Sequence, residues 1–156
     1  MLKALLFDLS YTLLFPRDKT YHEELNKLHK ELKGSPTYIP SEYYYLDYEI
    51  LEFLKSFKGN YKFYIFTSGS IQNIPEFHAK LKDVFNEIFS AGEMGLSKKD
   101  PEAYKTISKA LKVEPAELLF IDDIDLNCKA AAAAGLKTYQ YQNTNELIEF
   151  LNNLKD

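Results

Sequence analysis

Short apolar segments of strand length alternate along this chain with longer segments of helical periodicity. The strand-like segments span residues 3–9, 61–67, 118–121 and 136–141, with a weaker one at residues 87–91. Their near-continuous apolar character is typical of strands covered on both faces of a parallel sheet. The alternation predicts an α/β fold, a doubly wound, Rossmann-like parallel sheet of about five strands with flanking helices and right-handed crossovers.

The segments between these strands carry helix signals. Apolar residues at helical spacing form two groups: Tyr21, Leu25, Leu28 and Leu32, then Leu46, Ile50, Phe53 and Phe57. Further helices are expected at residues 101–111, where a proline opens the first turn, at residues 125–134, and at residues 144–154. Gly135 is the expected stop of the helix that precedes it.

The interval of residues 13–60 has no strand signal and is longer than a single crossover requires. We expect two helices in it, joined by a tyrosine-rich connector at residues 38–48. The tyrosines of that connector either pack on the sheet or line the mouth of a site. We therefore read residues 1–156 as one domain, with residues 13–60 as a short helical insert beside its active face.

Charge and cysteine content narrow the class of protein. Lysine plus arginine is 19 and aspartate plus glutamate is 23, so the net charge is −4, which disfavours a nucleic-acid partner. Cys128 is the single cysteine, which excludes an internal disulfide and a cysteine zinc cluster and fits a reducing compartment. The apolar start of the chain is too short for a signal peptide or a membrane span, so we expect a cytoplasmic protein without a membrane partner.

The remaining candidates for metal or thiol chemistry are weak. His22, His29 and His78 have no ligand spacing, and we expect them at the surface. Cys128 has no evident base beside it, and a buried, inert thiol is expected.

Chemistry is expected where the strands end, because ligands of such sheets bind beyond the carboxyl ends of the strands. Asp8 follows the first strand, Thr67 and Ser68 end the second, and Asp122 and Asp123 end the third. Packing does not call for acids there, and like charges held close need a cation. Carboxylate oxygens suit Mg²⁺, although helix capping and turn formation are alternative roles for these residues.

A lysine-bearing segment, Gly95-Leu96-Ser97-Lys98-Lys99-Asp100-Pro101, lies between the weak strand and a helix. Lys98 would balance the acids and hold an anionic oxygen of a substrate. Lys99 competes for this role, and a solvated surface lysine is the alternative. Acids, a metal, a lysine and hydroxyls together suggest phosphoryl transfer to a carboxylate nucleophile.

These motifs resemble those of the haloacid dehalogenase-like (HAD) superfamily over nearly the whole chain. Asp8-Leu9-Ser10-Tyr11-Thr12 resembles the first motif, DxDxT, and Thr67 after an apolar strand resembles the second. The segment around Lys98 is similar to the third motif, GxxKPDP. Leu119-Phe120-Ile121-Asp122-Asp123, followed by Asn127, Ala131, Ala134 and Gly135, resembles the fourth.

The resemblance implies a role for each residue. Asp8 is the nucleophile that forms an aspartyl-phosphate, and Lys98 orients it. Thr67, with Ser68 beside it, binds a phosphoryl oxygen. The implied Mg²⁺ ligands are Asp8, the main-chain carbonyl of Ser10, Asp122 and Asp123. The family's cap follows the first strand, and the short insert here suggests a reduced cap and an open site.

One position departs from the family pattern. The phosphatases of the family carry a second aspartate two residues after the nucleophile, where this chain has Ser10. A serine hydroxyl is no proton donor near neutral pH, and general acid–base catalysis is worth about 10²–10⁴-fold. We expect slow hydrolysis of alkyl phosphates and a smaller effect on activated esters.

Three hypotheses remain open. The first is a Mg²⁺-dependent phosphate-ester hydrolase acting on a phosphorylated small molecule or a surface-presented phosphate. The alternative is a catalytically impaired member that binds a phosphorylated ligand or a protein partner. The third, a phosphonatase or dehalogenase, is disfavoured because no lysine of the insert has a Schiff-base signal and the paired acids are of a metal-binding type. The sequence has no signal for the substrate's identity or the oligomeric state.

Overall fold

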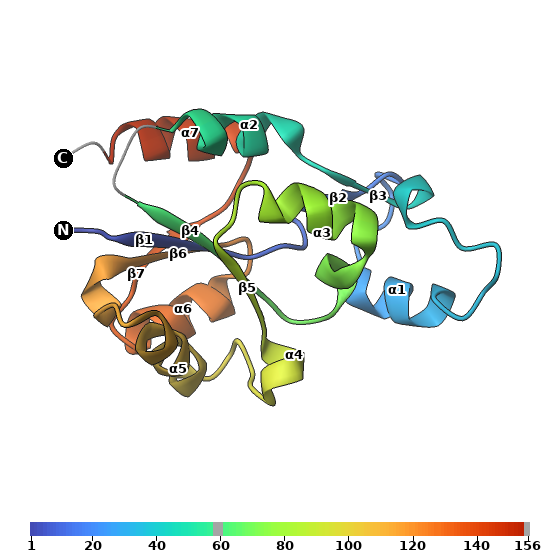
Figure 1. Cartoon of the computed structure of the whole chain (residues 1–156). Helices are drawn as coiled ribbons and strands as arrows, with labels where there is room; N and C mark the ends of the chain where they lie inside the picture. The colour runs from blue at the N-terminus through green and yellow to red at the C-terminus, as the bar shows by residue number, and fades with distance from the viewer. Residues whose placement is uncertain (58–60, 155–156) are drawn as a thin grey trace.

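A five-stranded parallel sheet runs through the centre of the molecule in the order β5-β4-β1-β6-β7 (Figure 1). Its strands are β1 (Ala4–Phe7), β4 (Lys62–Thr67), β5 (Glu87–Ser90), β6 (Leu118–Asp122) and β7 (Lys137–Gln140). The computed structural model describes residues 1–57 and 61–154. All neighbouring strands of this sheet pair in parallel, which confirms the predicted fold class, and the weak strand signal at residues 87–91 is confirmed too.

Alternate residues of each central strand enter two different hydrophobic cores, because successive side chains of a strand point to opposite faces. In β1, Leu5 and Phe7 enter one core, while Ala4 and Leu6 enter the other. The helices α2 (Tyr48–Ser56), α3 (Pro75–Lys82) and α7 (Thr144–Asn152) cover the first face, and α5 (Pro101–Leu111) and α6 (Asp125–Ala133) cover the second (Figure 1). This double coverage explains why the strands are apolar throughout.

The predicted helix boundaries are correct at the positions where a local capping signal determines them. Helix α5 begins after Asp100, whose side chain accepts a hydrogen bond from the amide of Glu102, with Pro101 in the first turn. Helix α6 ends just before Gly135, which has a φ of +96° that other residues rarely adopt.

The residues between β1 and β4 contain two short strands that the sequence did not reveal. β2 (Leu14–Pro16) and β3 (Tyr44–Leu46) form an antiparallel pair, with α1 (Leu25–Leu32) between them in sequence. The prediction of no strand in residues 13–60 is therefore wrong. Strands of three residues are too short to show a period-2 pattern, and their partners lie far apart in the chain.

The pairing also shortens the helices that were predicted there. Tyr21 precedes α1, and Leu46 belongs to β3 rather than to α2. Leu46 enters the core and the partly buried Tyr21 packs against it, each from outside the helix.

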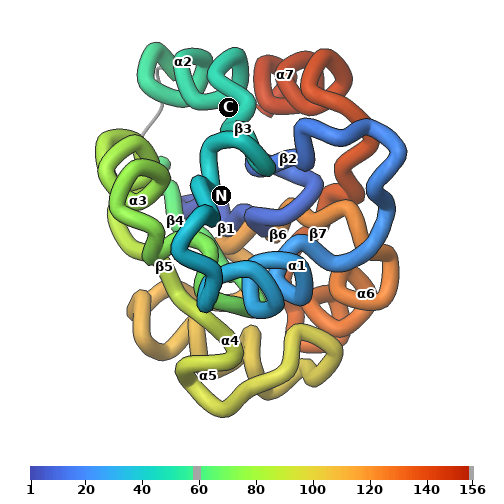
Figure 2. Tube along the Cα trace, turned by 90° about the vertical axis from the view of Figure 1, so that its right-hand side faces the viewer, coloured from blue at the N-terminus to red at the C-terminus, as the bar shows by residue number. Residues whose placement is uncertain are grey.

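Only part of the predicted insert lies near the carboxyl ends of the strands. Helix α1 and the β2–β3 pair lie there, whereas α2 packs beside α7 as part of a layer that covers the sheet (Figures 1 and 2). In the tyrosine-rich connector, Tyr44 is buried in the core while Tyr43, Tyr45 and Tyr48 are exposed. Residues 58–60, the last of the predicted insert, lie outside the described residues. Among the described helices, none has the length and apolar character needed to cross a membrane.

Candidate active site

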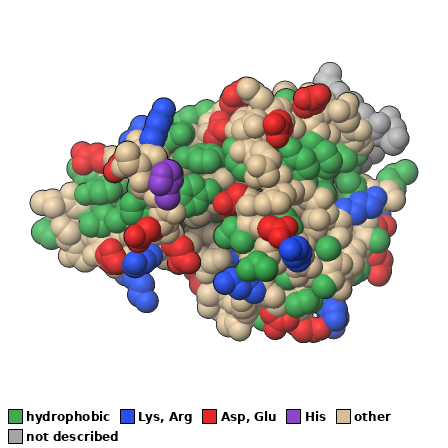
Figure 3. Space-filling model, turned by 180° about the vertical axis from the view of Figure 1, so that it is seen from behind, with side chains coloured by type: hydrophobic (Ala, Val, Ile, Leu, Met, Phe, Trp, Pro, Cys, Tyr) green, Lys and Arg blue, Asp and Glu red, His purple; other side chains and the backbone are tan. Residues whose placement is uncertain are grey.

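A cavity of about 540 Å³ opens at the carboxyl ends of the strands, beyond β1. Strand β1 pairs with β4 on one side and with β6 on the other, so the strand order reverses at β1. Such a switch point is where parallel α/β sheets bind ligands. Figure 3 shows the surface hollowed between the projecting lobe that contains α1 and the sheet domain, with acidic side chains around the hollow.

Asp8 and Lys98 form a buried ion pair at the floor of this cavity. The Nζ atom of Lys98 lies 2.5 Å from Oδ1 of Asp8 and 2.8 Å from Oδ2 of Asp122. Lys98 and Asp8 are each only 5% exposed. Tyr104 fixes the lysine from below, because its hydroxyl donates to the main-chain oxygen of Lys98 at 2.6 Å. Lys99, the alternative candidate, is exposed, so the structure assigns this contact to Lys98.

Asp122 and Asp123 differ in their surroundings. Asp122 is fully buried, and its oxygens accept hydrogen bonds from the amide of Ile124 at 2.8 Å and from the side chain of Asn127 at 3.0 Å. Asp123 lines the cavity, and its buried Oδ1 atom has no hydrogen-bond partner. Asp122 therefore holds Lys98 and the start of α6, while Asp123 has an oxygen free for a ligand.

The three carboxylates lie close enough to influence one another. Ligand atoms of Asp8, Asp122 and Asp123 all lie within 4.8 Å of one another. Burial raises the pKa of Asp8 to about 6, and the negative charge of Asp122 adds to the effect against the opposing charge of Lys98. Burial, together with the charges of Asp8 and Asp122, raises the pKa of Asp123 to about 8. Two acids with raised pKa values and one unpaired oxygen form a site that a cation would stabilise.

Burial by itself lowers the pKa of Lys98, but the charges of Asp8 and Asp122 outweigh it, so the pKa is raised above its usual value. Lys98 therefore stays protonated at the floor of the cavity.

The end of β4 forms a second side of the cavity. Thr67, Ser68 and Gly69 all line it, and Thr67 is buried. The loop that follows β4 is held in place by Ser90, whose Oγ donates to the main-chain oxygen of Gly69 at 2.7 Å. All the predicted site residues thus meet at one place: Asp8, Ser10, Thr67, Ser68, Lys98 and Asp123 line the cavity, and Asp122 lies beneath it.

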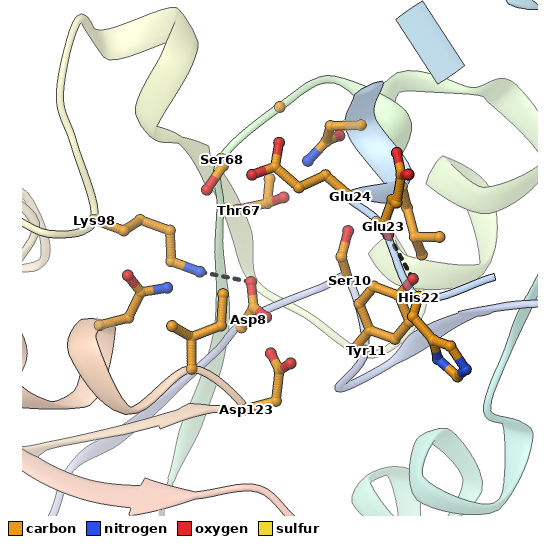
Figure 4. A pocket seen from close by; sticks show the side chains of 15 residues that line it. Asp8, Ser10, Tyr11, His22, Glu23, Glu24, Thr67, Ser68, Lys98 and Asp123 are labelled. Atoms are coloured by element: carbon orange, nitrogen blue, oxygen red, sulfur yellow. Dashed lines mark hydrogen bonds and ion pairs between the residues drawn. The ribbon is translucent and has the colours of Figure 1, made fainter. Parts of the chain in front are cut away.

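Part of the cavity wall was missed from the sequence. Tyr11 and residues 22–26 line it, opposite the acids of the floor (Figure 4). Tyr11 has a φ of 61°, a left-handed conformation that the sequence does not signal. Nothing local marks residues 22–26, because they reach the cavity only through the chain path between β2 and β3.

The predicted surface histidines differ in their positions. His22 is exposed, as expected, but it lies at the cavity. His29 is half-buried, and its ring nitrogen lies 2.9 Å from the hydroxyl of Tyr38, so the prediction of a surface residue is wrong for His29. Cys128 is buried, as predicted, and burial raises the pKa of its thiol to about 12.

The fold and the site together define the class of protein. It is an α/β protein with a Rossmann-like sheet, in which several acids and a buried lysine meet at the switch point. The sequence model of the haloacid dehalogenase-like hydrolases matches residues 37–135, which is more than half of the chain. The chain belongs to the haloacid dehalogenase-like hydrolase family.

Two relatives with a similar sequence are a hydrolase and a phosphatase by name. Flavin mononucleotide hydrolase 1 of Arabidopsis thaliana is 32% identical over 127 residues, covering 80% of this chain and 51% of the relative. Enolase-phosphatase E1 of Thioalkalivibrio sulfidiphilus is 39% identical over 79 residues, covering 47% of this chain and 34% of the relative. The chain thus spans about half the length of the first relative and about a third of the second.

Solved structures share the fold over nearly the whole chain. A HAD family enzyme of Bacteroides thetaiotaomicron, in complex with magnesium and inorganic phosphate, has a TM-score of 0.65 at 19% identity and covers 94% of this chain and 99% of its own. A HAD-like hydrolase of Porphyromonas gingivalis has a TM-score of 0.71 at 16% identity and covers 100% of this chain and 99% of its own. At these identities the likeness establishes the fold.

Proposed function

We propose that this protein is a Mg²⁺-dependent phosphate-ester hydrolase in which Asp8 is the nucleophile. The observation that carries the proposal is the position of Asp8, a buried carboxylate beside Lys98 at the floor of a cavity at the switch point. A carboxylate held in this way is oriented for attack, because its neighbour fixes one oxygen and its burial excludes bulk water.

In the proposed reaction, an oxygen of Asp8 attacks phosphorus and the bond to the ester oxygen breaks, giving an aspartyl-phosphate. Water then attacks the same phosphorus and releases Asp8 and inorganic phosphate. Lys98 orients Asp8 and offsets its charge. The hydroxyls of Thr67 and Ser68 bind phosphoryl oxygens from the β4 side of the cavity.

The acids at the floor fit a magnesium ion. The free Oδ1 atom of Asp123 is buried and lacks a partner, and hard carboxylate oxygens are the ligands that Mg²⁺ prefers. The ion would be held by Asp8, Asp123 and the main-chain carbonyl of Ser10. Asp122 would support the site from beneath, because its oxygens already accept hydrogen bonds and pair with Lys98. When bound, Mg²⁺ supplies positive charge that polarises the phosphoryl group.

The proposed substrate is a phosphate monoester of a small molecule. The cavity of about 540 Å³ lies in the usual range for small-molecule sites, about 300–1,000 Å³. Within the described part of the predicted insert, residues 22–26 line the cavity, so a reduced cap and access for a surface-presented phosphate are part of the proposal. The domain division, with residues 13–60 as the cap-bearing insert of one domain, is likewise proposed.

A second candidate function is binding without efficient turnover. The observation that favours it is Ser10, whose hydroxyl stands at the position of the family's acid–base aspartate. Under this reading the protein binds a phosphorylated ligand or a protein partner, and Asp8→Asn leaves that binding intact.

The test compares p-nitrophenyl phosphate with glycerol phosphate, each with and without Mg²⁺, and uses Asp8→Asn as the control. The nitrophenolate leaving group needs no proton, so it reports on the nucleophile and the metal alone. Mg²⁺-dependent turnover that disappears in Asp8→Asn is the expected result. If folded wild-type protein gives no turnover above Asp8→Asn on either ester, the hydrolase proposal fails and the binding function is favoured.

A further inference from the structure

We propose that Glu24 is the general acid and base of the reaction, in place of the aspartate that Ser10 replaces. This inference rests on the proposed hydrolase function and adds a catalytic residue from the cavity wall. Glu24 immediately precedes α1 and lines the cavity together with Asp8 and Ser68.

The main chain at Glu24 is held in place by two tyrosines. The hydroxyl of Tyr11 donates to the main-chain oxygen of Glu23 at 2.6 Å, and the hydroxyl of Tyr21 donates to that of Glu24 at 3.2 Å. The next residue, Leu25, is fully buried in the main core. The backbone beside Glu24 is therefore fixed on both sides, although its side chain is exposed to the cavity.

The same segment sits directly on the loop that follows β4. A Cβ atom placed on Gly69 would lie only 2.2 Å from Oδ1 of Asn26, so glycine allows the Asn26 amide to pack directly against this loop. Oδ1 of Asn26 is itself buried without a hydrogen-bond partner. Because Gly69 follows Thr67 and Ser68, this contact sets the distance between the wall and the phosphate-binding end of β4.

Figure 4 shows that Glu24 differs from the other titratable groups of the wall. Its carboxyl group extends over the cavity toward Ser68 and Thr67, whereas the carboxyl group of Glu23 and the ring of His22 point away. Glu23 is also paired with Lys27 at 3.2 Å. Within the described residues, the carboxylate of Glu24 has neither a hydrogen bond nor an ion pair, so it is available to exchange protons.

The chemistry follows from this position. The protonated carboxyl of Glu24 gives its proton to the ester oxygen as the bond to phosphorus breaks, and Asp8 forms its bond to phosphorus. The leaving group departs as a neutral alcohol. The Glu24 carboxylate then takes a proton from the water that attacks the aspartyl-phosphate, which restores both carboxyl groups to their starting states. Ser10 takes part in neither transfer.

The first experiment measures kcat/KM of Glu24→Gln with p-nitrophenyl phosphate and with glycerol phosphate. Glutamine keeps the size and removes the exchangeable proton. We expect a loss of about 10²-fold or more for the alkyl ester and a change below about threefold for the aryl ester, since only the alkoxide needs protonation. Glu31→Gln is the matched control, because Glu31 is exposed on α1 and does not line the cavity, and it should leave both rates unchanged.

The second experiment adds an aspartate where the family has one. Ser10→Asp in the Glu24→Gln background should recover most of the lost alkyl rate, because a proton donor returns near the nucleophile. Equal losses on both esters in Glu24→Gln, or no loss on either, would overturn the role of Glu24. Failure of the hydrolase proposal is a separate result, because the wild type would then turn over neither ester.

Discussion

The floor and the wall of the cavity are built in different ways. The floor, formed by Asp8, Asp122 and Lys98, is buried and joined by ion pairs at 2.5 and 2.8 Å. The wall, formed by residues 22–26, is mostly exposed and is held by two tyrosine hydroxyls, one buried leucine and one contact with Gly69. The floor is anchored by the sheet, whereas the wall depends on a few contacts between distant segments.

Because of this difference, substitutions at the floor and at the wall should affect different properties of the protein. Lys98 pairs with both buried acids of the floor, so its removal leaves two carboxylates unpaired at a high energetic cost. The wall contributes little buried charge, so a change there should act mainly on the reaction and less on folding. The three predictions below test this contrast, two by substitutions at the floor and at the wall and one by the pH dependence of the floor.

Lys98→Met should have the largest effect on stability. The change leaves Asp8 and Asp122 buried without their cation, and breaking a buried ion pair in this way costs about 3–5 kcal/mol of unfolding free energy. Urea unfolding without Mg²⁺ at pH 8 measures it. Lys99→Met is the matched control, because Lys99 is exposed, and its change should stay within about 0.5 kcal/mol. Equal stability of the two variants would refute the contrast.

Gly69→Ala should have an intermediate effect on stability, because its methyl group meets the side-chain amide of Asn26. Overpacking of this kind costs about 1–3 kcal/mol, and here either the Asn26 side chain or the wall must move away from the loop that follows β4. Thermal unfolding and KM for p-nitrophenyl phosphate measure the two consequences.

The control for this prediction is Gly34→Ala, since a Cβ atom at Gly34 meets nothing within 4 Å. The double variant Gly69→Ala/Asn26→Ala should recover most of the loss, because it removes the atoms that clash. A double variant no better than Gly69→Ala alone would place the strain elsewhere.

The third prediction concerns the pH dependence of stability without Mg²⁺. Folding raises the pKa of Asp123 from 3.8 to about 8 and that of Asp8 from 3.8 to about 6, so the folded state binds more protons than the unfolded state in this range. Their contribution to the unfolding free energy is therefore fully present below pH 3.8 and is lost as the pH rises toward 8.

Asp123→Asn tests this dependence, because it removes the acid with the larger shift. Urea unfolding of both proteins between pH 5 and 9 should show a shallower decline for the variant. Saturating Mg²⁺ should flatten the wild-type curve too, since the cation offsets the charges that repel. A variant with the same slope as the wild type would show that Asp123 does not titrate in this range.

The sequence by itself determined the sheet and the floor of the site. Apolar runs covered on both faces report directly on buried strands, and a residue that follows such a strand must lie at the carboxyl edge. Asp8, Thr67 and Asp122 could therefore be placed together from their positions alone. The end of α5 at Leu111 and of α6 before Gly135 were equally local, because capping depends on neighbours in the chain.

Only the tertiary structure decided which residues form the wall and which role each acid has. The β2–β3 pair joins residues far apart in sequence, and Glu24 reaches the cavity through contacts with Tyr11 and Tyr21. Asp122 and Asp123 are the same residue type at adjacent positions, yet one is saturated with hydrogen bonds and the other has a free oxygen. Such differences depend on what surrounds each side chain in space, and that arrangement exists only once the segments have packed.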